Sequence, residues 1–499
     1  MKLYELIGGY KNADITGETN LEIDGIEYNS KEAGKDKLFV AIKGEKLDGH
    51  DYIADAQSRG TKAFLVNKSY HIVKPDQTII RVDNTLDALA YVSSRFYKEP
   101  SGDLTIAGIT GTNGKTTITY ILESIWKGEK QIVGVIGTVN YRFNDICEPS
   151  GLTTPMSRDL QGMLSRMRDS GVSRVCMEVS SHSLEKNRIS YCDLDAAVFT
   201  NITQDHLDYH IDFTNYFNAK KKLFSEVLTR SRKKNKYAIS NLDDPRGEDI
   251  VREFNGRKYM YSVSDSAAHI FAATTQISES GIKARLRSPW GQINIESGLI
   301  GEHNLSNILA AVTCSLCMGT DIPSVENGVK ELKNIPGRLE RIENASGFSV
   351  FVDYAHTPDA LKNVLTVLRT LTKNRLIVVF GCGGDRDTTK RPLMGIHAAE
   401  LADKVIVTSD NPRTETPGSI MLDIERGIRS VNSRNINYVL IEDRREAIFN
   451  AVEMLENGDV LLVAGKGHED YQIMGKEKRH FDDREVCREA IMEVQGNQN

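Results

Sequence analysis

Short apolar runs alternate with amphipathic stretches along the first hundred residues. Three runs have the length and β-branched content of strands, and residues 86–97 have helical periodicity. The predicted strands cover residues 37–43, 63–66 and 78–82. The helix is followed by Glu99-Pro100-Ser101-Gly102, and proline and glycine so close together interrupt regular structure. We therefore expect a small α/β domain over residues 1–100.

The second region opens on a nucleotide-binding pattern. Leu104 to Thr110 predicts a buried strand, Gly111 to Lys115 a tight loop, and the next stretch a helix with one apolar stripe. The stripe consists of Ile118, Ile121, Leu122 and Ile125. A second interruption, Asn334-Ile-Pro-Gly-Arg338, follows another helical stretch. These features predict a central P-loop ATPase-like domain with a parallel sheet over residues 101–335.

The last region alternates apolar strands with helical patterns such as residues 444–455. Its predicted strands cover residues 376–380, 405–408, 438–441 and 460–464. The alternation predicts a Rossmann-like, doubly wound parallel sheet over residues 336–499, so the chain is an α/β protein with three domains. Ligands bind beyond the carboxyl ends of such strands. Three polar, glycine-rich segments should therefore converge on one edge, namely residues 381–386, 410–413 and 465–469.

Composition and charge exclude several classes of function. The 499 residues include 63 Lys and Arg against 69 Asp and Glu, without the basic excess that nucleic-acid binders usually carry. We expect no nucleic-acid partner and interpret the basic run over residues 230–236 as a solvated loop. No apolar run approaches the ~20 residues that span a bilayer, and the amino terminus lacks a signal-peptide core. We therefore expect no membrane insertion and a cytoplasmic location.

The cysteines favour the same compartment. There are 7, mostly isolated, which is typical of reduced thiols in a cytosol. The one close pair, Cys314 and Cys317, lies in an apolar segment without a second pair or neighbouring histidines. Core packing is therefore a better interpretation of this pair than a zinc site.

Residues 111–116, Gly-Thr-Asn-Gly-Lys-Thr, resemble a phosphate-binding loop. In such loops backbone N–H groups surround phosphate oxygens, the lysine neutralises charge and the hydroxyl reaches a magnesium ion. Ile109 departs from the strict pattern, which has glycine at that position. A nucleoside triphosphate is the favoured ligand. The glycines at 381–384 do not predict NAD, because Arg386 stands where the dinucleotide pattern requires glycine.

Two other central segments carry candidate metal ligands. Glu178 ends the apolar run over residues 172–177, a position that fits either a magnesium ligand or a structural carboxylate. Residues 205–210 contain two Asp and two His, a density that favours a magnesium–phosphate site. A polar loop with capping Asp residues is the alternative.

The order of these motifs resembles that of the Mur ligases, which build the peptide of peptidoglycan. The shared segments are GTNGKT at 111–116, EVSSH at 178–182, DHLDYH at 205–210, YFNAKKKLF at 216–224, GEHNLSN at 301–307, PGR at 336–338 and DYAHTP at 353–358. Within the family, DNPR at 410–413 and GKGHE at 465–469 resemble the member that adds the third residue. The resemblance covers nearly the whole chain. It implies a ligase in which ATP phosphorylates a carboxylate and an amine then attacks the acyl phosphate.

The resemblance also implies an ATP and Mg²⁺ site. Lys115 would contact the transferred phosphate, Thr116 and Glu178 would hold one Mg²⁺, and His206 would help to hold a second. Lys220 matches a lysine that the family carries as a carbamate formed from carbon dioxide, an additional oxygen ligand, whereas Lys221 and Lys222 are expected to be solvated. The implied ATP-binding residues are Gly111, Thr112, Asn113, Gly114, Lys115, Thr116, Thr117, Asn304, Asn307, Arg338, Asp353 and His356.

The implied acceptor is UDP-N-acetylmuramoyl-L-alanyl-D-glutamate, and the implied amine is meso-diaminopimelate. The acceptor residues would be Tyr28, Ser30, Glu45, Lys46, Leu47, Thr153, Thr154, Ser180, Lys186 and Arg188. Asn29-Ser30-Lys31 departs from the Asp-Ser-Arg common in the family, as do Leu152 and Lys186 from amides found in some members. The diaminopimelate residues would be Arg386, Asp410, Asn411, Pro412, Arg413, Gly465 and Glu469. Arg413 decides this assignment, because a guanidinium pairs with the distal carboxylate that lysine lacks.

Other functions remain open at this stage. The same ligase could use L-lysine, or the chain could be a related ligase such as a folylpolyglutamate synthase or the D-glutamate-adding enzyme, against which DNPR and GKGHE argue. A catalytically inactive UDP-muramyl-peptide sensor is disfavoured by the joint presence of Lys115, Glu178, His206 and Lys220. Only the basic run at 230–236 suggests a nucleic-acid-dependent motor. We expect a monomer.

Overall fold

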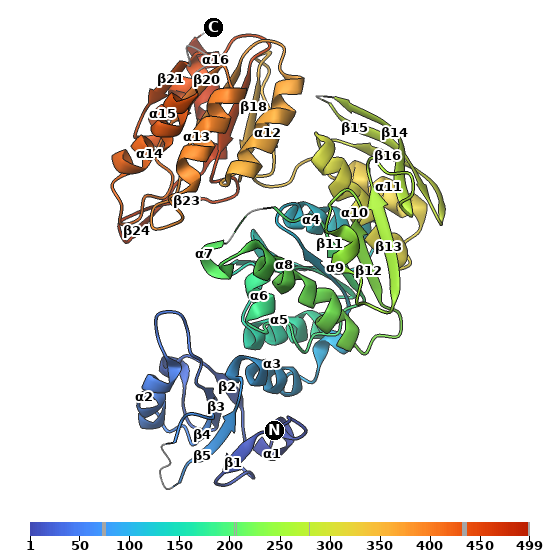
Figure 1. Ribbon diagram of the computed structural model, residues 1–499, viewed down its shortest axis with the longest axis vertical. Coiled ribbons are helices and arrows are strands. Elements are labelled where there is room, and N and C mark those ends of the chain that lie inside the picture. Colours follow the sequence, from blue (N-terminus) through green and yellow to red (C-terminus); the bar gives the residue numbers. More distant parts are fainter. Residues whose placement is uncertain (72–75, 204, 206, 279, 432–436, 498–499) are drawn as a thin grey trace.

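The computed structural model describes residues 1–71, 76–203, 205, 207–278, 280–431 and 437–497. Figure 1 shows three main sheets that follow one another along the long axis, with the N-terminal sheet at the bottom and the C-terminal sheet at the top. The middle strands of each sheet are buried between helices of the same region. Among the residues that the structure describes, no helix combines the length and apolar composition that crossing a membrane requires.

The N-terminal sheet has the order β1-β5-β4-β3-β2. Its strands are β1 (Asp14–Thr16), β2 (Gly25–Glu27), β3 (Lys37–Val40), β4 (Ala63–Asn67) and β5 (Thr78–Val82). Alternate residues of β3 to β5 point to opposite faces, so one set packs on α3 (Thr85–Phe96) and the other on α2 (Ile53–Ser58). The three predicted strands and the predicted helix are confirmed, with the first strand ending earlier than expected, at Val40.

The central sheet has eleven strands in the order β16-β15-β14-β13-β12-β11-β6-β10-β7-β8-β9. They are β6 (Thr105–Thr110), β7 (Val133–Ile136), β8 (Asn140–Phe143), β9 (Ile146–Pro149), β10 (Arg174–Glu178), β11 (Ala196–Phe199), β12 (Tyr237–Asn241), β13 (Arg257–Ser262), β14 (Ile270–Ser278), β15 (Gly281–Ser288) and β16 (Gly291–Ser297). The strands from β14 to β7 are parallel, as predicted for this region. Antiparallel strands extend both edges, which the parallel-sheet prediction did not include. One face of β15 and β16 is exposed, and antiparallel strands tolerate such exposure.

Helices cover both faces of the central sheet. One face is packed against α4 (Lys115–Gly128), α10 (Glu302–Cys317) and α11 (Ile322–Glu331), and the other against α5 (Ser157–Asp169), α6 (Ser181–Glu185) and α8 (Phe213–Lys222). The predicted apolar stripe of α4 is completely buried. Cys314 and Cys317 are buried in α10, as core packing predicts.

The C-terminal sheet has the order β17-β18-β22-β19-β20-β21. Its strands are β17 (Glu340–Ile342), β18 (Ser349–Asp353), β19 (Leu376–Phe380), β20 (Lys404–Val407), β21 (Asn437–Leu440) and β22 (Val460–Ala464). All except β17 are parallel. One face packs on α12 (Pro358–Leu371), α13 (Lys390–Leu401) and α14 (Pro417–Ser430), and the other on α15 (Arg444–Glu453) and α16 (Asp483–Asn497). The doubly wound sheet is therefore confirmed, and a hairpin of β23 (Tyr471–Met474) and β24 (Glu477–His480) follows it.

Of two expectations about surface lysines and arginines, one is confirmed and one was wrong. The basic run over residues 230–236 is a largely exposed loop, although Arg232 Nη2 lies 2.6 Å from Asp193 Oδ2 and Lys233 Nζ donates to the carbonyl of Leu104 at 2.6 Å. Lys221 and Lys222 were expected to be solvated but are half-buried and paired, at 2.9 Å from Glu253 and 2.7 Å from Glu185. Acidic residues distant in the sequence neutralise these lysines, a feature that charge patterning along one segment does not reveal.

Candidate functional site

The phosphate-binding loop joins β6 to α4 through two glycines with positive φ. A Cβ on Gly111 (φ +149°) would lie 1.8 Å from Thr200 Oγ1, and one on Gly114 (φ +87°) would lie 2.2 Å from Asn307 Oδ1. Both positions therefore require glycine. Ile109 instead lies inside β6, fully buried and paired with Glu178 of β10. The departure from the strict loop pattern thus falls on a core strand position.

Two lysine side chains meet at this loop. Lys115 Nζ donates to the carbonyl oxygens of Gly111 and Thr112 at 2.9 and 2.8 Å, and Lys220 Nζ, from α8, donates to that of Gly111 at 2.8 Å. Lys220 is 2% exposed. Burial, and then the charge of Lys115, hold the pKa of Lys220 well below its usual value. The Lys220 amine is therefore biased towards its neutral, nucleophilic form.

Glu178 is the centre of a buried network of oxygen atoms. Its carboxylate accepts hydrogen bonds from Thr116 Oγ1 at 3.0 Å, from the Thr138 backbone N–H at 2.9 Å and from Thr138 Oγ1 at 3.0 Å. A hydroxyl beside a carboxylate is a donor set that Mg²⁺ prefers. In the described parts of the chain no three His, Cys, Asp or Glu side chains come together as a metal site. Mg²⁺ commonly needs only one or two carboxylates when phosphates complete its shell, so Thr116 and Glu178 fit such an ion.

The side chains of the Asp- and His-rich segment at 205–210 lie in two different environments. Asp205 lines the same cavity as Lys115. His210 is buried, and its Nε2 lies 2.9 Å from Ser181 Oγ. His206 lies outside the described residues.

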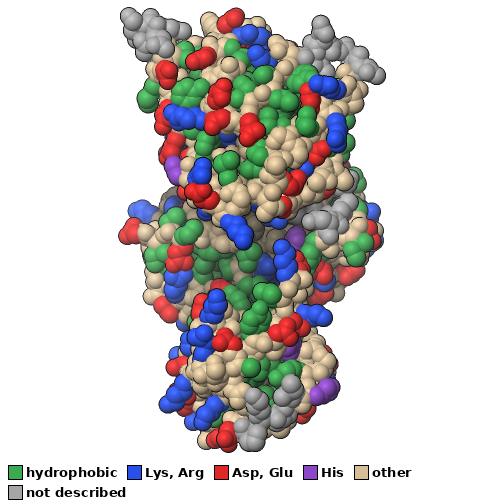
Figure 2. Space-filling model, turned by 90° about the vertical axis from the view of Figure 1, so that its left-hand side faces the viewer, with side chains coloured by type: hydrophobic (Ala, Val, Ile, Leu, Met, Phe, Trp, Pro, Cys, Tyr) green, Lys and Arg blue, Asp and Glu red, His purple; other side chains and the backbone are tan. Residues whose placement is uncertain are grey.

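A cavity of about 280 Å³ joins the loop to the C-terminal region. The cavity is lined by all the predicted loop residues except Gly111. It is also lined by Asn304 and Asn307 of α10 and by Arg338, Asp353 and His356. Arg338 Nη2 donates to Thr116 Oγ1 at 3.2 Å, and the Asp353 carboxylate accepts the N–H groups of Leu339 and Ala355. Figure 2 shows the surface hollowed between the middle and upper parts of the molecule, with Lys or Arg side chains at the rim.

The predicted acceptor residues are only partly brought together. Thr153, Thr154, Ser180 and Arg188 form one group next to Glu178: Thr154 Oγ1 donates to the Glu178 carbonyl at 2.8 Å, and Arg188 Nη1 to the Thr154 carbonyl at 2.8 Å. Lys186 Nζ reaches Glu45 Oε1 at 2.7 Å and so links the N-terminal and central regions.

The other predicted acceptor residues lie outside this group. Lys46 and Leu47 are exposed beside Glu45, and Ser30 is buried in the N-terminal region. Tyr28 donates to Asp159 and lines a separate cavity of about 520 Å³ together with Leu152. The structure therefore does not place Tyr28 in the Glu178 group.

The three segments predicted to converge at the C-terminal sheet do so. Asn411 Nδ2 donates to Glu469 Oε2 at 2.9 Å, and Arg413 Nη1 donates to the Gly384 carbonyl at 2.8 Å. A Cβ on Gly465 would lie 2.6 Å from Asp410 Oδ2. Burial and the nearby Asp410 raise the pKa of Glu469. The edge thus combines acidic groups for an ammonium with a guanidinium for a carboxylate.

Arg386, from the loop after β19, and Pro412, from the loop after β20, complete this edge. A Cβ on Gly383 would lie 2.9 Å from Arg413 Nη1 and 3.9 Å from Arg386 Cγ, and a Cβ on Gly384 would lie 1.9 Å from the Pro412 carbonyl oxygen. The two loops are therefore packed backbone against backbone, which only glycine permits.

The segment 465–469 also touches the hinge that follows the central region. A Cβ on Gly337 would lie 2.1 Å from the His468 backbone nitrogen, and one on Gly467 would lie 2.6 Å from Tyr354 Cβ. The His468 and Tyr354 rings are 4.8 Å apart, and the Arg338 guanidinium lies 4.9 Å from the Tyr354 ring centre. One short segment therefore contacts both the amino-acid edge and the nucleotide cavity.

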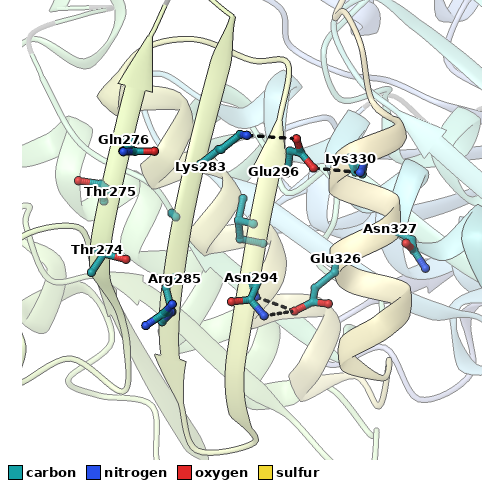
Figure 3. A pocket seen from close by; sticks show the side chains of 12 residues that line it. Thr274, Thr275, Gln276, Lys283, Arg285, Asn294, Glu296, Glu326, Asn327 and Lys330 are labelled. Atoms are coloured by element: carbon teal, nitrogen blue, oxygen red, sulfur yellow. Dashed lines mark hydrogen bonds and ion pairs between the residues drawn. The ribbon is translucent and has the colours of Figure 1, made fainter.

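A larger hollow, of about 690 Å³, lies on β14 to β16 and α11 (Figure 3) and shares no residue with the nucleotide cavity. Three of its charged side chains are paired with one another, since Glu296 lies 3.7 Å from Lys283 and 2.9 Å from Lys330. The Asn294 N–H, on the edge strand β16, donates to Glu326 at 2.6 Å. This hollow is consistent with a protected sheet edge rather than a ligand site.

Sequence reasoning missed Thr138 and Lys466. Thr138 follows β7, a parallel neighbour of β10, so the rule that ligands meet at carboxyl strand ends could have identified it. Lys466 is fully buried and donates to Asn411 Oδ1 at 3.1 Å. Its position inside GKGHE was the available signal.

Comparison with known families covers nearly the whole chain. Residues 22–97 match the Mur ligase family catalytic domain, residues 109–315 the Mur ligase middle domain, and residues 337–467 the Mur ligase glutamate ligase domain.

Individual relatives agree with the family models. A UDP-N-acetylmuramoyl-L-alanyl-D-glutamate–2,6-diaminopimelate ligase of Geobacter metallireducens is 42% identical over 99% of both chains. The ligase of the same name from Clostridioides difficile is 41% identical over 99% of this chain and 100% of the relative. A solved structure of such a ligase superposes with a TM-score of 0.72 at 30% identity, over 100% of this chain and 99% of the other. The chain therefore belongs to the Mur ligase family.

Proposed function

We propose that the chain is the ATP-dependent ligase that adds meso-2,6-diaminopimelate to UDP-N-acetylmuramoyl-L-alanyl-D-glutamate during cytoplasmic synthesis of peptidoglycan precursors. The observation that carries this proposal is Arg413, whose guanidinium lies next to Gly383 on the edge that also holds Asp410 and Glu469. The names of the relatives, each similar along its full length, support the same reaction.

The first chemical step is phosphoryl transfer from ATP to the D-glutamate carboxylate. Such transfer depends on positioning and charge neutralisation, which the loop N–H groups, Lys115 and Arg338 supply. In the part of the chain that the structure describes, the buried Nε atoms of Arg338 and Arg188 have no hydrogen-bond partner, which suits them to anionic phosphate or carboxylate oxygens. Bound Mg²⁺, which Thr116 and Glu178 would hold, would neutralise the phosphate charge. We assign His206 to a second Mg²⁺ by family resemblance.

Lys220 is proposed to carry a carbamate. Carbon dioxide adds only to a neutral amine, and burial of Lys220 favours that form. The N–H loses a proton as the N–C bond forms, so a cation becomes an anionic oxygen ligand. A protonated Lys220 would instead repel a metal ion next to Lys115.

The second step is attack by the amine of diaminopimelate on the acyl phosphate, with loss of phosphate. The attacking amine has to be held while the distal end of the substrate is recognised. Arg413 and Arg386 are proposed to take the distal carboxylate, and Asp410, Asn411 and Glu469 the ammonium, with Pro412 and Gly465 shaping the turns. L-lysine would leave Arg413 unpaired, which disfavours it.

The proposal extends to the domains and to the remaining residues of the two sites. The separate cores support domains at residues 1–100, 101–335 and 336–499. We propose that the adenine side of the ATP site and its border with the C-terminal region are formed by Asn304, Asn307, Asp353 and His356. We propose that the acceptor binds to the Glu178 group, to Lys186 and to the Glu45–Leu47 stretch. Unpaired cysteines fit a cytoplasmic protein. We propose a monomer, with no nucleic-acid partner.

Phosphate release tests the reaction directly. Purified protein is incubated with ATP, Mg²⁺ and UDP-N-acetylmuramoyl-L-alanyl-D-glutamate, and with meso-diaminopimelate, L-lysine or no amino acid, and product masses are recorded. We expect release only with meso-diaminopimelate, together with the tripeptide mass. A lysine product would retain the ligase and overturn the role of Arg413. No release with either amine would favour the sensor.

A further inference from the structure

A completely buried ion pair lies beneath the amino-acid edge. Arg444 opens α15 and Asp483 opens α16, and both side chains are 0% exposed. Arg444 Nε and Nη2 donate to the two carboxylate oxygens of Asp483, each at 2.7 Å. This bidentate geometry fixes the plane of the guanidinium.

The same guanidinium reaches two backbone carbonyls of the sheet. Nη2 donates to the Ala464 carbonyl at 2.9 Å, and Nη1 to the Ser409 carbonyl at 3.4 Å. Ala464 ends β22 immediately before Gly465, and Ser409 immediately precedes Asp410. One side chain therefore joins the two turns that carry the proposed diaminopimelate residues.

Those turns are interlocked above the pair. Asn411 bridges them, because its Nδ2 donates to Glu469 at 2.9 Å while its Oδ1 accepts from Lys466 at 3.1 Å. The Asp410 carboxylate packs against Gly465 so closely that a Cβ there would lie 2.6 Å from Oδ2. A small change in the spacing of the turns would therefore displace several of these groups together.

Stability alone is a poor reason to bury this pair. Removing two charges from water is costly, and well-packed apolar replacements of buried pairs are often neutral or stabilising. We propose that Arg444 and Asp483 are positioning residues for the amine substrate, which set the distance between the turns bearing Asp410 and Glu469. This inference rests on the proposed function of that edge.

The sheet contains a matched control pair at its opposite end. Arg375 immediately precedes β19 and Asp459 immediately precedes β22, with Arg375 Nη2 2.6 Å and Nε 3.1 Å from Asp459 Oδ2. Asp459 is as fully buried as Asp483, whereas the Arg375 side chain is 37% exposed. This pair also ties the sheet together, but at its amino end, away from the amino-acid edge.

The test compares Arg444→Lys with Arg375→Lys. Lysine keeps the charge but cannot reach Asp483 and both carbonyls at once. For each variant, KM for meso-diaminopimelate, KM for ATP, kcat and the unfolding temperature are measured. We expect Arg444→Lys to raise KM for meso-diaminopimelate at least tenfold and to reduce its preference over L-lysine. KM for ATP should change less than twofold, and Arg375→Lys should leave both KM values unchanged.

A double variant separates positioning from folding. Arg444→Met with Asp483→Leu removes both charges, so we expect an unfolding temperature close to the wild type and a raised KM for meso-diaminopimelate. Equal KM changes in Arg444→Lys and Arg375→Lys, or parallel changes in KM for ATP and for the amine, would overturn the inference. Wild-type protein without diaminopimelate-dependent phosphate release would overturn the proposed function and the inference with it.

Discussion

Lys115 and Lys220 place two amino groups on a single carbonyl oxygen, that of Gly111. Two ammonium ions so close repel each other in a buried site, and this repulsion adds to burial in lowering the pKa of Lys220. Lys220, the more deeply buried of the two lysines, is therefore the one that we propose reacts with carbon dioxide.

Replacing Lys220 tests whether its amine forms the proposed carbamate. We expect Lys220→Ala to lose at least about 100-fold in turnover, because even outer-shell partners of metal sites contribute about 10- to 100-fold. Added bicarbonate should not restore activity, since no amine remains to be modified. Steady-state phosphate release measures the loss. Lys221 lies next to Lys220 on α8 and is paired with Glu253, so Lys221→Ala is the control and should remain active. A wild-type rate in Lys220→Ala would contradict the proposed carbamate.

We propose that the choice of amine depends on Arg413. Loss of a charge-assisted hydrogen bond costs about 1.5 to 3 kcal/mol, so Arg413→Ala should lower kcat/KM for meso-diaminopimelate by about 10- to 150-fold. L-lysine should lose little. Competition between the two amines, read by product mass, gives the ratio. Arg479→Ala, an exposed arginine paired with Glu477 in β24, is the control, and an unchanged preference in Arg413→Ala would contradict the assignment.

Among the elements, the buried parallel strands were the easiest to predict. Strands such as β19 and β22 are continuous apolar runs of five residues, buried along their whole length, and α12, which precedes β19, is clearly amphipathic. Among the antiparallel additions, β9 is mostly exposed and has no long apolar run, and β15 and β16 alternate buried and exposed residues instead of forming the continuous apolar runs that identified the core strands. Local pattern therefore recovers the core strands and fails at the sheet edges.

The site was predictable to a similar degree. Strand ends indicated where the loop, Glu178 and the 410–413 and 465–469 segments would meet. Thr138 was overlooked although it follows a parallel strand, whereas Arg444 was not identified because it acts from beneath the edge. The contacts of Arg444 depend on tertiary packing, which spacing along the sequence does not encode.

The contact between α4 and α11 depends on one glycine. A Cβ on Gly328 of α11 would lie 2.3 Å from the Cα of Ile125 in α4. We expect Gly328→Ala to destabilise the protein by about 1 to 3 kcal/mol, as overpacking does. Gly128→Ala, at the end of α4 with no atom within 4 Å of the added Cβ, should be neutral or stabilising. Urea unfolding compares the two, and equal midpoints would contradict this account.

At the scale of the whole molecule, the nucleotide cavity is lined by the central and C-terminal regions together. A ligand that binds only the native state stabilises it by about 2.7 kcal/mol at 100 times its Kd. We therefore expect a non-hydrolysable ATP analogue with Mg²⁺ to slow amide hydrogen exchange both in β6 and α4 and in β18 and α12. The N-terminal strands β3 to β5 are the internal control. Protection confined to the loop at 111–116 would show that the C-terminal region does not close on the nucleotide.

Because of the segment 465–469, the two walls of the proposed amine site should differ in how freely their residues can be substituted. Lys466 and Glu469 both contact Asn411 of the proposed amine edge, while Gly467 and His468 pack against Gly337 and Tyr354. Under the proposed function, a mutation here that altered amine choice would also disturb the contact with the nucleotide cavity, so two selective pressures would act on this wall. On the opposite wall, the side-chain hydrogen bonds described for Arg413 go to the carbonyl oxygens of Gly384 and Asn411 and not to Gly337 or Tyr354. Substitutions that change the amine substrate should therefore accumulate on the wall that carries Arg413 and Arg386. Directed-evolution libraries are best confined to that wall.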